Sequence, residues 1–193
     1  DSANSSSTVT VLTNAAGFLA MGPSLATIPA DNTDLVVHVS GINQGMHDDL
    51  RVANDYASAL STAAMLSDVG YEVVLSASRQ EAIDVAHYAY TRQTKRAFVH
   101  IFDGAYAACE RSVLSPPSSK APEPCTYTGP SAPVTALVMP HGAMSHRARA
   151  LLLSLPPHLR GKIGIVSVRR LGSWDAAVLR RAVPTSVQTL RVV

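Results

Sequence analysis

Residues 72–102, EVVLSASRQEAIDVAHYAYTRQTKRAFVHIF, decide the fold because they predict a complete strand–helix–strand unit. The two ends of this stretch, EVVLSA and AFVHIF, are short apolar runs with β-branched and aromatic residues, which is typical of buried strands. Between them, Ser78 precedes Glu81 by three residues, the capping-box pattern that opens a helix. We expect this helix to run to about Arg92 and to face the sheet with Ile83, Ala86 and Tyr90. Two strands joined by a helix lie parallel in a sheet, so this stretch predicts an α/β fold.

Upstream of this unit, the sequence predicts two further strands and one long helix. The strands are residues 8–12 and 34–40, and the helix is residues 46–69, with Gly70 at the position of a C-terminal cap. Residues 13–33 contain two Gly and two Pro, so we expect irregular structure there.

Downstream, a Pro- and Ser-rich segment at residues 113–132 is expected to form a long loop. The elements expected after it are strands at 133–139, 162–168 and 186–192 and helices at 143–155 and 174–182. Strands that alternate with helices at this spacing predict an α/β fold, a three-layer sandwich with a mostly parallel sheet, Rossmann-like in the broad sense. We expect a flexible arm at residues 1–7 and a single α/β domain over residues 8–193.

The composition favours a folded chain that stays outside membranes. It is 47% hydrophobic and 16% charged, and no apolar run reaches the ~18 residues of a membrane span. The sequence begins at Asp1 without an initiator Met or a signal-peptide pattern, which indicates a processed precursor or a trimmed chain. The two cysteines, Cys109 and Cys125, flank the Pro-rich segment, and without a secretion signal we expect free thiols.

The charges are divided unevenly along the chain. Residues 1–110 carry twelve acidic and five basic residues, whereas residues 111–193 carry two acidic and eleven basic residues. The two halves either neutralise each other in the fold or present faces of opposite sign. Opposite faces favour head-to-tail association or an acidic partner such as RNA.

The strongest case for an enzyme comes from polar residues that follow the predicted strands. In α/β proteins, sites lie at the carboxyl ends of parallel strands, where this chain has Asn43, His47, Asp103 and His141. Such residues could serve a hydrolase or transferase by acid–base catalysis. However, the chain has no dinucleotide-binding glycine pattern, no P-loop and no nucleophile elbow, and we expect no cofactor and no metal site.

Six arginines of the basic half could form a phosphate-binding face, namely Arg147, Arg149, Arg169, Arg170, Arg180 and Arg181. The alternative is an ordinary solvated basic surface, because no RNA-binding motif accompanies these residues. The histidines inside predicted strands, His38 and His100, are expected to be packed or hydrogen-bonded in the core rather than to act as ligands.

Residues 59–104, ALSTAAMLSDVGYEVVLSASRQEAIDVAHYAYTRQTKRAFVHIFDG, resemble an α/β segment in capsid proteins of totivirus-like double-stranded RNA viruses of fungi. The resemblance carries over no functional residue. It implies intracellular particles built from many identical copies and proteins matured from longer precursors. The partner would then be a second copy of the chain or a larger protein shell, and the location would be the cytoplasm or the virion.

Together these patterns favour a non-enzymatic α/β module that acts through protein–protein contacts, with a capsid or capsid-associated role. The first alternative is a small α/β hydrolase or transferase with its site at the strand ends. The second alternative is a nucleic-acid-binding module that uses the C-terminal arginines. No membrane partner is expected.

Overall fold

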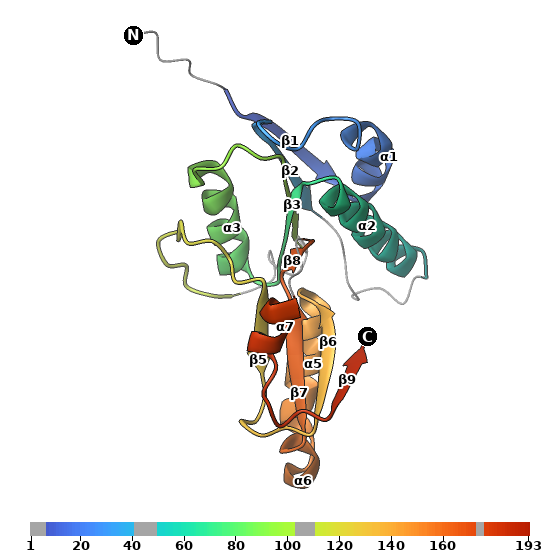
Figure 1. Ribbon diagram of the computed structural model, residues 1–193, viewed down its shortest axis with the longest axis vertical. Coiled ribbons are helices and arrows are strands. Elements are labelled where there is room, and N and C mark those ends of the chain that lie inside the picture. Colours follow the sequence, from blue (N-terminus) through green and yellow to red (C-terminus); the bar gives the residue numbers. More distant parts are fainter. Residues whose placement is uncertain (1–6, 41–49, 103–110, 173–175) are drawn as a thin grey trace.

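The computed structural model describes residues 7–40, 50–102, 111–172 and 176–193, and it confirms the predicted α/β sandwich. The strands form two mostly parallel sheets, one with the strand order β1-β2-β4-β3-β8 and one with the order β5-β7-β6-β9. Figure 1 shows these sheets one above the other along the long axis of the molecule. We call the part built on the five-stranded sheet the first lobe and the part built on the four-stranded sheet the second lobe.

The first lobe contains four parallel strands and one short antiparallel strand. The parallel strands are β1 (Val9–Asn14), β2 (Leu35–Ser40), β3 (Glu72–Ser76) and β4 (Phe98–Phe102). The antiparallel strand β8 (Arg170–Leu171) pairs with β3 at the edge of this sheet. Apart from the edge strand β1, the parallel strands are buried along nearly their whole length, which explains their continuous apolar runs.

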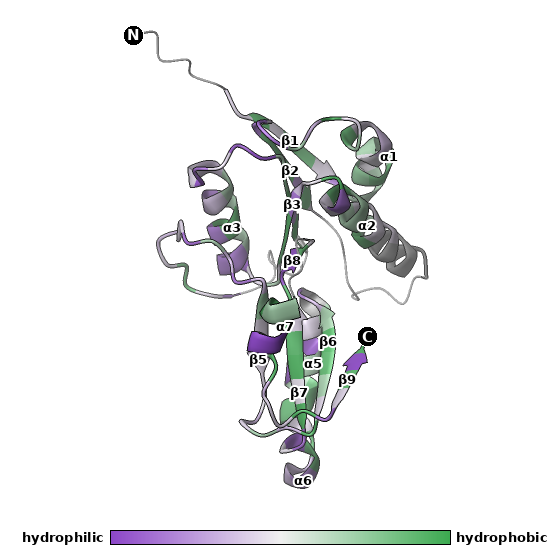
Figure 2. Ribbon diagram, viewed as in Figure 1, coloured by the Kyte–Doolittle hydropathy of each residue, from purple (hydrophilic) through white to green (hydrophobic). Residues whose placement is uncertain are grey.

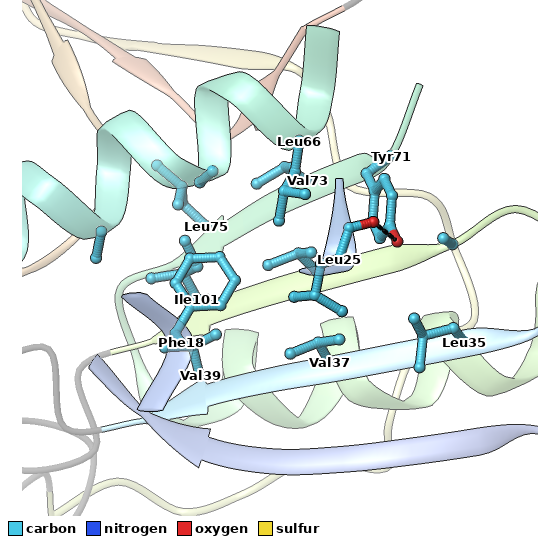
Figure 3. Packing of buried hydrophobic residues seen from close by; sticks show 14 of the residues in the cluster. Phe18, Leu25, Leu35, Val37, Val39, Leu66, Tyr71, Val73, Leu75 and Ile101 are labelled. Carbon is cyan, nitrogen blue, oxygen red and sulfur yellow. Dashed lines mark hydrogen bonds between the residues drawn. The ribbon is translucent and has the colours of Figure 1, made fainter. Parts of the chain in front are cut away.

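Three helices cover the two faces of the first sheet, α1 (Ala15–Leu25), α2 (Leu50–Asp68) and α3 (Arg79–Thr91). Helices α1 and α2 lie on one side and α3 lies on the other (Figure 1). Figure 3 shows the larger core, a single buried cluster that contains Phe18 of α1, Leu66 of α2 and Val37 of β2. Alternate residues of the same strands, such as Val36, face α3 on the opposite side.

Helix α1 was not expected, and the prediction of irregular structure over residues 13–33 is wrong there. The side chain of Asn14 accepts a hydrogen bond from the Gly17 backbone N–H at 2.9 Å, which caps the start of the helix. Phe18 and Leu25 lie seven residues apart, two helical turns, and both are buried. Burial of this apolar stripe therefore outweighs the poor helix propensity of the Gly and Pro residues.

Helix α3 begins as predicted but faces the sheet with different residues. The Ser78 side chain accepts a hydrogen bond from the Glu81 N–H at 3.2 Å, which confirms the N-terminal cap. The buried residues of the helix are Val85 and Ala89, whereas Tyr90 is 50% exposed. The helix is rich in Ala and carries no single wide apolar stripe, so its sequence pattern did not indicate the correct face.

The second lobe contains β5 (Cys125–Thr128), β6 (Thr135–Pro140), β7 (Ile163–Val168) and β9 (Thr189–Val192). Strands β6, β7 and β9 are parallel, and β5 runs antiparallel to β7. Figure 2 shows β6 and β7 largely in the green of hydrophobic residues. The prediction of a loop over 113–132 is wrong at β5, which lies inside that segment. Its Thr and Tyr residues suit a strand at the edge of the sheet. The thiol of Cys125 on this strand is free and buried.

The helices of the second lobe are α5 (Ala143–Ser154), α6 (Pro157–Arg160) and α7 (Ala176–Ala182). Helix α5 packs against one face of the sheet, where Leu152 contacts the cluster around Ile165. Helix α7 packs on the other face through Val178 and Leu179. No helix within the described ranges is long and apolar enough to cross a membrane.

The chain passes directly from the second sheet into the first, and this connection positions the two lobes. Strand β7 ends at Val168, and β8 begins two residues later beside β3. The Leu75 N–H donates a hydrogen bond to the carbonyl of Arg169 at 2.7 Å. Because β3 and β8 are antiparallel, the carboxyl end of β3 points toward the carboxyl end of β7. The site-bearing edges of the two sheets therefore face each other.

Candidate functional site

A partly buried ionic cluster lies where the two carboxyl edges meet. Glu81 lies in the first turn of α3, His141 follows β6, and Arg169 follows β7. The Glu81 Oε2 atom lies 2.8 Å from His141 Nε2, and its Oε1 atom lies 3.6 Å from Arg169 Nη2. The side chain of His141 is 1% exposed. We call Glu81, His141 and Arg169 the junction cluster.

Backbone hydrogen bonds fix the positions of these side chains. The His141 N–H donates to the carbonyl of Val168 at 2.8 Å, which holds the ends of β6 and β7 together. The Ala77 N–H donates to the Glu81 carboxylate at 2.9 Å, which holds this side chain of the first turn of α3 in place beside the second lobe. The capping box predicted from the sequence thus supplies one member of the junction cluster.

The electrostatics of the cluster favour an ionised carboxylate. Burial by itself would raise the pKa of Glu81. The hydrogen bond and charge of His141, the charge of Arg169 and the hydrogen bond from the Ala77 N–H act in the opposite direction and lower this pKa to about 2. Glu81 is therefore an anion at neutral pH and holds its partners by charge-assisted contacts.

Arg149 extends this polar region into the second sheet. Its Nη2 atom lies 3.2 Å from Ser167 Oγ and 3.5 Å from Thr126 Oγ1. Burial lowers the pKa of Arg149, an effect that the nearby Glu81 carboxylate opposes and the charge of Arg169 reinforces. An arginine stays protonated despite such shifts, so Arg149 adds a buried positive charge behind the junction cluster.

The chemistry open to the junction cluster is limited by its contacts. A general base must reach a substrate proton within hydrogen-bond distance, directly or through one water. The Nε2 atom of His141 is already bound to Glu81, and its ring is almost wholly enclosed. The junction cluster therefore links the two lobes through His141 Nε2 and the Glu81 carboxylate, and the buried Nδ1 atom of His141 has no hydrogen-bond partner among the described residues.

A second buried polar network crosses the first sheet. The Nδ1 atoms of His38 and His100 lie 3.1 Å apart, on neighbouring strands β2 and β4. His100 Nε2 lies 2.8 Å from Ser76 Oγ, and His38 Nε2 lies 3.1 Å from Tyr90 Oη. The Tyr90 hydroxyl is also 3.2 Å from Thr10 Oγ1 at the surface. The histidines are thus hydrogen-bonded in the core, as predicted.

Both histidines are neutral in this network. Burial, and secondarily the charge of His38, lowers the pKa of His100 to about 3, and burial also lowers the pKa of His38. One Nδ1–H therefore donates to the other Nδ1, and a single proton lies between the rings. Ser76 beside His100 has the layout of a nucleophile and its base. However, Ser76 is 3% exposed and His100 is 1% exposed, so neither reaches a substrate.

Three of the four residues predicted for an enzyme site, Asn43, His47 and Asp103, lie outside the described residues. The fourth, His141, is engaged by Glu81 in the junction cluster. Glu81 itself was recognised in the sequence only as a helix cap, because nothing in a linear pattern indicates a contact between residues 60 positions apart. Among the described residues, no group of three potential metal ligands comes together.

The six arginines predicted as a phosphate-binding face do not share one surface. Arg149 and Arg169 turn inward as described, and Arg170 Nη2 pairs with Glu72 Oε1 at 3.0 Å. Arg147 is exposed on α5, whereas Arg180 and Arg181 are exposed on α7, on the other face of the sheet. The structure thus holds Arg169 and Arg170 in ion pairs and Arg149 in hydrogen bonds, and it leaves Arg147, Arg180 and Arg181 exposed at the surface.

Two hollows in the first lobe are further candidate sites. One is a cavity of about 800 Å³ at the start of β3, lined by Glu72, Tyr88 and Arg170 among others. Tyr88 and Arg170 both contact the Glu72 carboxylate, and Arg170 balances the charge of Glu72. The second is an open, mostly apolar groove beside α3, with Leu12 and Ile83 in its lining. Neither hollow brings together a catalytic set.

No protein-family model matches the chain. A stretch of 97 residues is 33% identical to part of a pyruvate-flavodoxin oxidoreductase from a Nostoc species. This stretch covers 49% of the chain but 8% of the Nostoc protein, so the chain spans less than a tenth of that protein's length. Nothing in these comparisons bears on the resemblance to capsid proteins, which stays a prediction.

Proposed function

We propose that this chain is a non-catalytic α/β module of a redox protein and acts through protein–protein contacts. The observation that carries the proposal is the junction cluster. At the edge where α/β enzymes present their catalytic groups, Glu81, His141 and Arg169 are bound to one another. Side chains that hold two lobes together in this way serve architecture rather than turnover.

The similarity to the Nostoc protein supports the redox part of the proposal. It covers about half of this chain but a small part of a much larger enzyme. The similar stretch is therefore no larger than one module of the Nostoc enzyme. Similarity over one module does not by itself transfer the activity of the whole enzyme. Pyruvate and flavodoxin appear in the name of the Nostoc protein. For this chain we propose a supporting module that does not itself catalyse the reaction.

A domain exchange tests this proposal directly. The part of the Nostoc enzyme that aligns with this chain is replaced by the corresponding residues of this chain, and pyruvate-flavodoxin oxidoreductase activity is measured. We expect the chimera to keep its activity within about tenfold of the parent, because an equivalent module restores the same contacts. A control chimera with an unrelated α/β domain of equal length is expected to lose nearly all activity.

Two outcomes would contradict the proposal. One is a chimera that folds, as judged by circular dichroism and thermal melting, yet has no more activity than the control chimera. The other is catalysis of the reaction by the isolated chain. Light scattering on the isolated chain tests the capsid role separately, since particles of many copies in the absence of any partner would favour the capsid prediction.

A further inference from the structure

We propose that five hydrogen-bonded side chains of the first lobe form a proton relay between the surface beside β1 and the carboxyl edge of β3. The relay consists of Thr10, Tyr90, His38, His100 and Ser76, in that order. This inference goes beyond the proposed function and depends only on contacts within the first lobe. It gives the buried histidine pair a task in addition to packing, namely the transfer of a proton in either direction.

The five side chains form an unbroken line through the first lobe. Thr10 Oγ1 lies 3.2 Å from Tyr90 Oη, and Tyr90 Oη lies 3.1 Å from His38 Nε2. The Nδ1 atoms of the two histidines lie 3.1 Å apart, and His100 Nε2 lies 2.8 Å from Ser76 Oγ. All four distances are within hydrogen-bond reach, so no contact along the relay requires a bridging water.

The ends of the relay differ from its middle in their surroundings. Thr10 is exposed and Tyr90 is 50% exposed, so solvent reaches this end. His38 and His100 are buried, and both nitrogens of each ring contact members of the relay. Ser76 is the last residue of β3, at the carboxyl edge where α/β proteins place their chemistry. The relay therefore connects the surface with a site-bearing edge through the core.

Every member of the relay can both donate and accept a hydrogen bond. Hydroxyl groups do so, and a neutral imidazole has one N–H and one unprotonated nitrogen. A backbone N–H, an arginine or an ionised carboxylate would fix the direction of the hydrogen bonds, because each of them has one role only. The four contacts of the relay join hydroxyl and imidazole groups alone, so their direction can reverse.

The relay consequently has two arrangements in which every contact is satisfied. In the inward arrangement each group donates to the next one toward Ser76, so His38 carries its proton on Nδ1 and His100 on Nε2. In the outward arrangement each group donates toward Thr10, so His38 carries its proton on Nε2 and His100 on Nδ1. Both rings are neutral in both arrangements, and one N–H lies between the two Nδ1 atoms in each.

Conversion of the inward into the outward arrangement moves one proton across the lobe. A water at the surface gives a proton to Thr10, Thr10 passes its own to Tyr90, and Tyr90 passes its own to His38 Nε2. The Nδ1 proton of His38 moves to His100 Nδ1, and the Nε2 proton of His100 moves to Ser76. Ser76 releases its hydroxyl proton to a water at the carboxyl edge. The hydroxide and hydronium formed at the two ends neutralise each other in the solvent, and the reverse conversion moves a proton outward.

NMR of the ring nitrogens tests the two arrangements, because protonated and unprotonated imidazole nitrogens have well-separated chemical shifts. Ser76→Ala leaves His100 Nε2 without its partner, and an unpaired acceptor is tolerated better than an unpaired N–H. Ser76→Ala is therefore expected to lock the outward arrangement. Tyr90→Phe is expected to lock the inward one, for the same reason at His38 Nε2. The parent chain is expected to show ring shifts between those of the two variants.

Hydrogen exchange separates a relay from a static network. The proton between the two Nδ1 atoms is expected to exchange with solvent at least about tenfold more slowly in the Tyr90→Phe variant than in the parent chain, because its route to the surface is cut. A merely structural role of Tyr90 predicts faster exchange in this variant, since loss of a hydrogen bond makes local opening more frequent.

The matched controls remove hydroxyl groups outside the relay. Tyr88→Phe changes a tyrosine of the same helix, whose hydroxyl donates to Glu72. Ser67→Ala changes a serine of α2, whose hydroxyl donates to the carbonyl of Leu171. Both controls are expected to keep the ring shifts and the exchange rate of the parent chain.

Three results would overturn the proposal. The first is the same position of the ring protons in Ser76→Ala and in Tyr90→Phe. The second is a parent chain whose ring shifts equal those of one variant, which would mean a fixed direction. The third is exchange in Tyr90→Phe that is as fast as in the parent chain or faster. Circular dichroism confirms that the variants fold, and if one does not, the other is compared with the parent chain by the same NMR measurements.

Discussion

The carboxylate of Glu81 and the imidazole of His141 lie 2.8 Å apart and join the two lobes. Glu81 belongs to the first lobe and His141 to the second, and the histidine ring is almost wholly buried. The contact uses two residue types that often perform acid–base catalysis, and it joins them to each other across the two lobes. Its removal is therefore expected to change stability.

Replacing Glu81 by Gln is expected to lower the free energy of unfolding by about 2 kcal/mol, because His141 and Arg169 lose their anionic partner in a largely buried place. Urea unfolding followed by circular dichroism measures this change. The matched control is Glu123→Gln, which removes an exposed partner of Lys120 and is expected to cost less than about 0.5 kcal/mol. Equal effects of the two changes would show that the junction cluster contributes no stability.

The pH dependence of stability is expected to report the same contact. The pKa of Glu81 is lowered from 4.5 in the unfolded chain to about 2 in the fold. Its stabilising effect is therefore complete above pH 4.5 and is lost as the pH falls from there toward 2. Unfolding free energies measured across this window are expected to fall less steeply for the Glu81→Gln variant than for the parent chain. Parallel curves for the two proteins would contradict the assignment.

The strands of the fold were predictable because their signal is local. The run DLVVHVS at residues 34–40 became β2 with a shift of one residue at its start, since buried parallel strands are apolar along their whole length. The sequence does not predict helix α1, because its Gly and Pro residues have poor helix propensity. Its buried Phe18 and Leu25 supply tertiary contacts that such propensities do not include.

The candidate site was less predictable because it depends on how the lobes meet. The sequence placed His141 and Arg169 at strand ends, and both do lie there. It could not indicate that Glu81, 60 residues before His141, would be their partner. That contact requires the chain to leave the second sheet after β7 and to join the first sheet as β8. A strand of two residues carries no recognisable sequence pattern.

Replacing Phe18 by Ala is expected to destabilise the first lobe by about 3–5 kcal/mol, because Phe18 is fully buried and its removal leaves a cavity. Chemical unfolding measures the change. Leu12→Ala serves as the control, since Leu12 is 79% exposed and its truncation is expected to cost less than about 0.5 kcal/mol. A small effect at Phe18 would contradict the packing of α1 in Figure 3.

Replacing Gly172 by Ala is expected to disturb the connection between the lobes. Gly172 has a φ of +79°, and an added Cβ would lie 2.8 Å from the Cβ of Ser67 on α2. The strain and the clash together are expected to cost about 2 kcal/mol or more. Gly161→Ala is the control, because its φ is −70° and a Cβ there meets only one atom, at 3.4 Å. Similar melting temperatures for the two variants would contradict this geometry.

The paired histidines of the first sheet are expected to make the fold sensitive to mild acid. The pKa of His100 is lowered from 6.5 to about 3 by its burial, so the unfolded chain binds a proton in this range that the folded chain excludes. Stability from this residue is complete above pH 6.5 and is lost as the pH falls toward 3. Between pH 6.5 and 4.5 His100 therefore already lowers the stability as the pH falls, while the stabilising effect of Glu81 is still complete.

Replacing His100 by Leu is expected to flatten the pH dependence of stability between pH 6.5 and 4.5. It also removes the hydrogen-bond partner of Ser76 and of His38, which is expected to cost about 2–3 kcal/mol at neutral pH. His158→Asn on α6, at an exposed histidine, is the control and is expected to leave both the stability and its pH profile unchanged. Urea unfolding at several pH values measures both effects. An unchanged slope in the Leu variant would mean that the buried His100 does not contribute to the acid sensitivity of the fold.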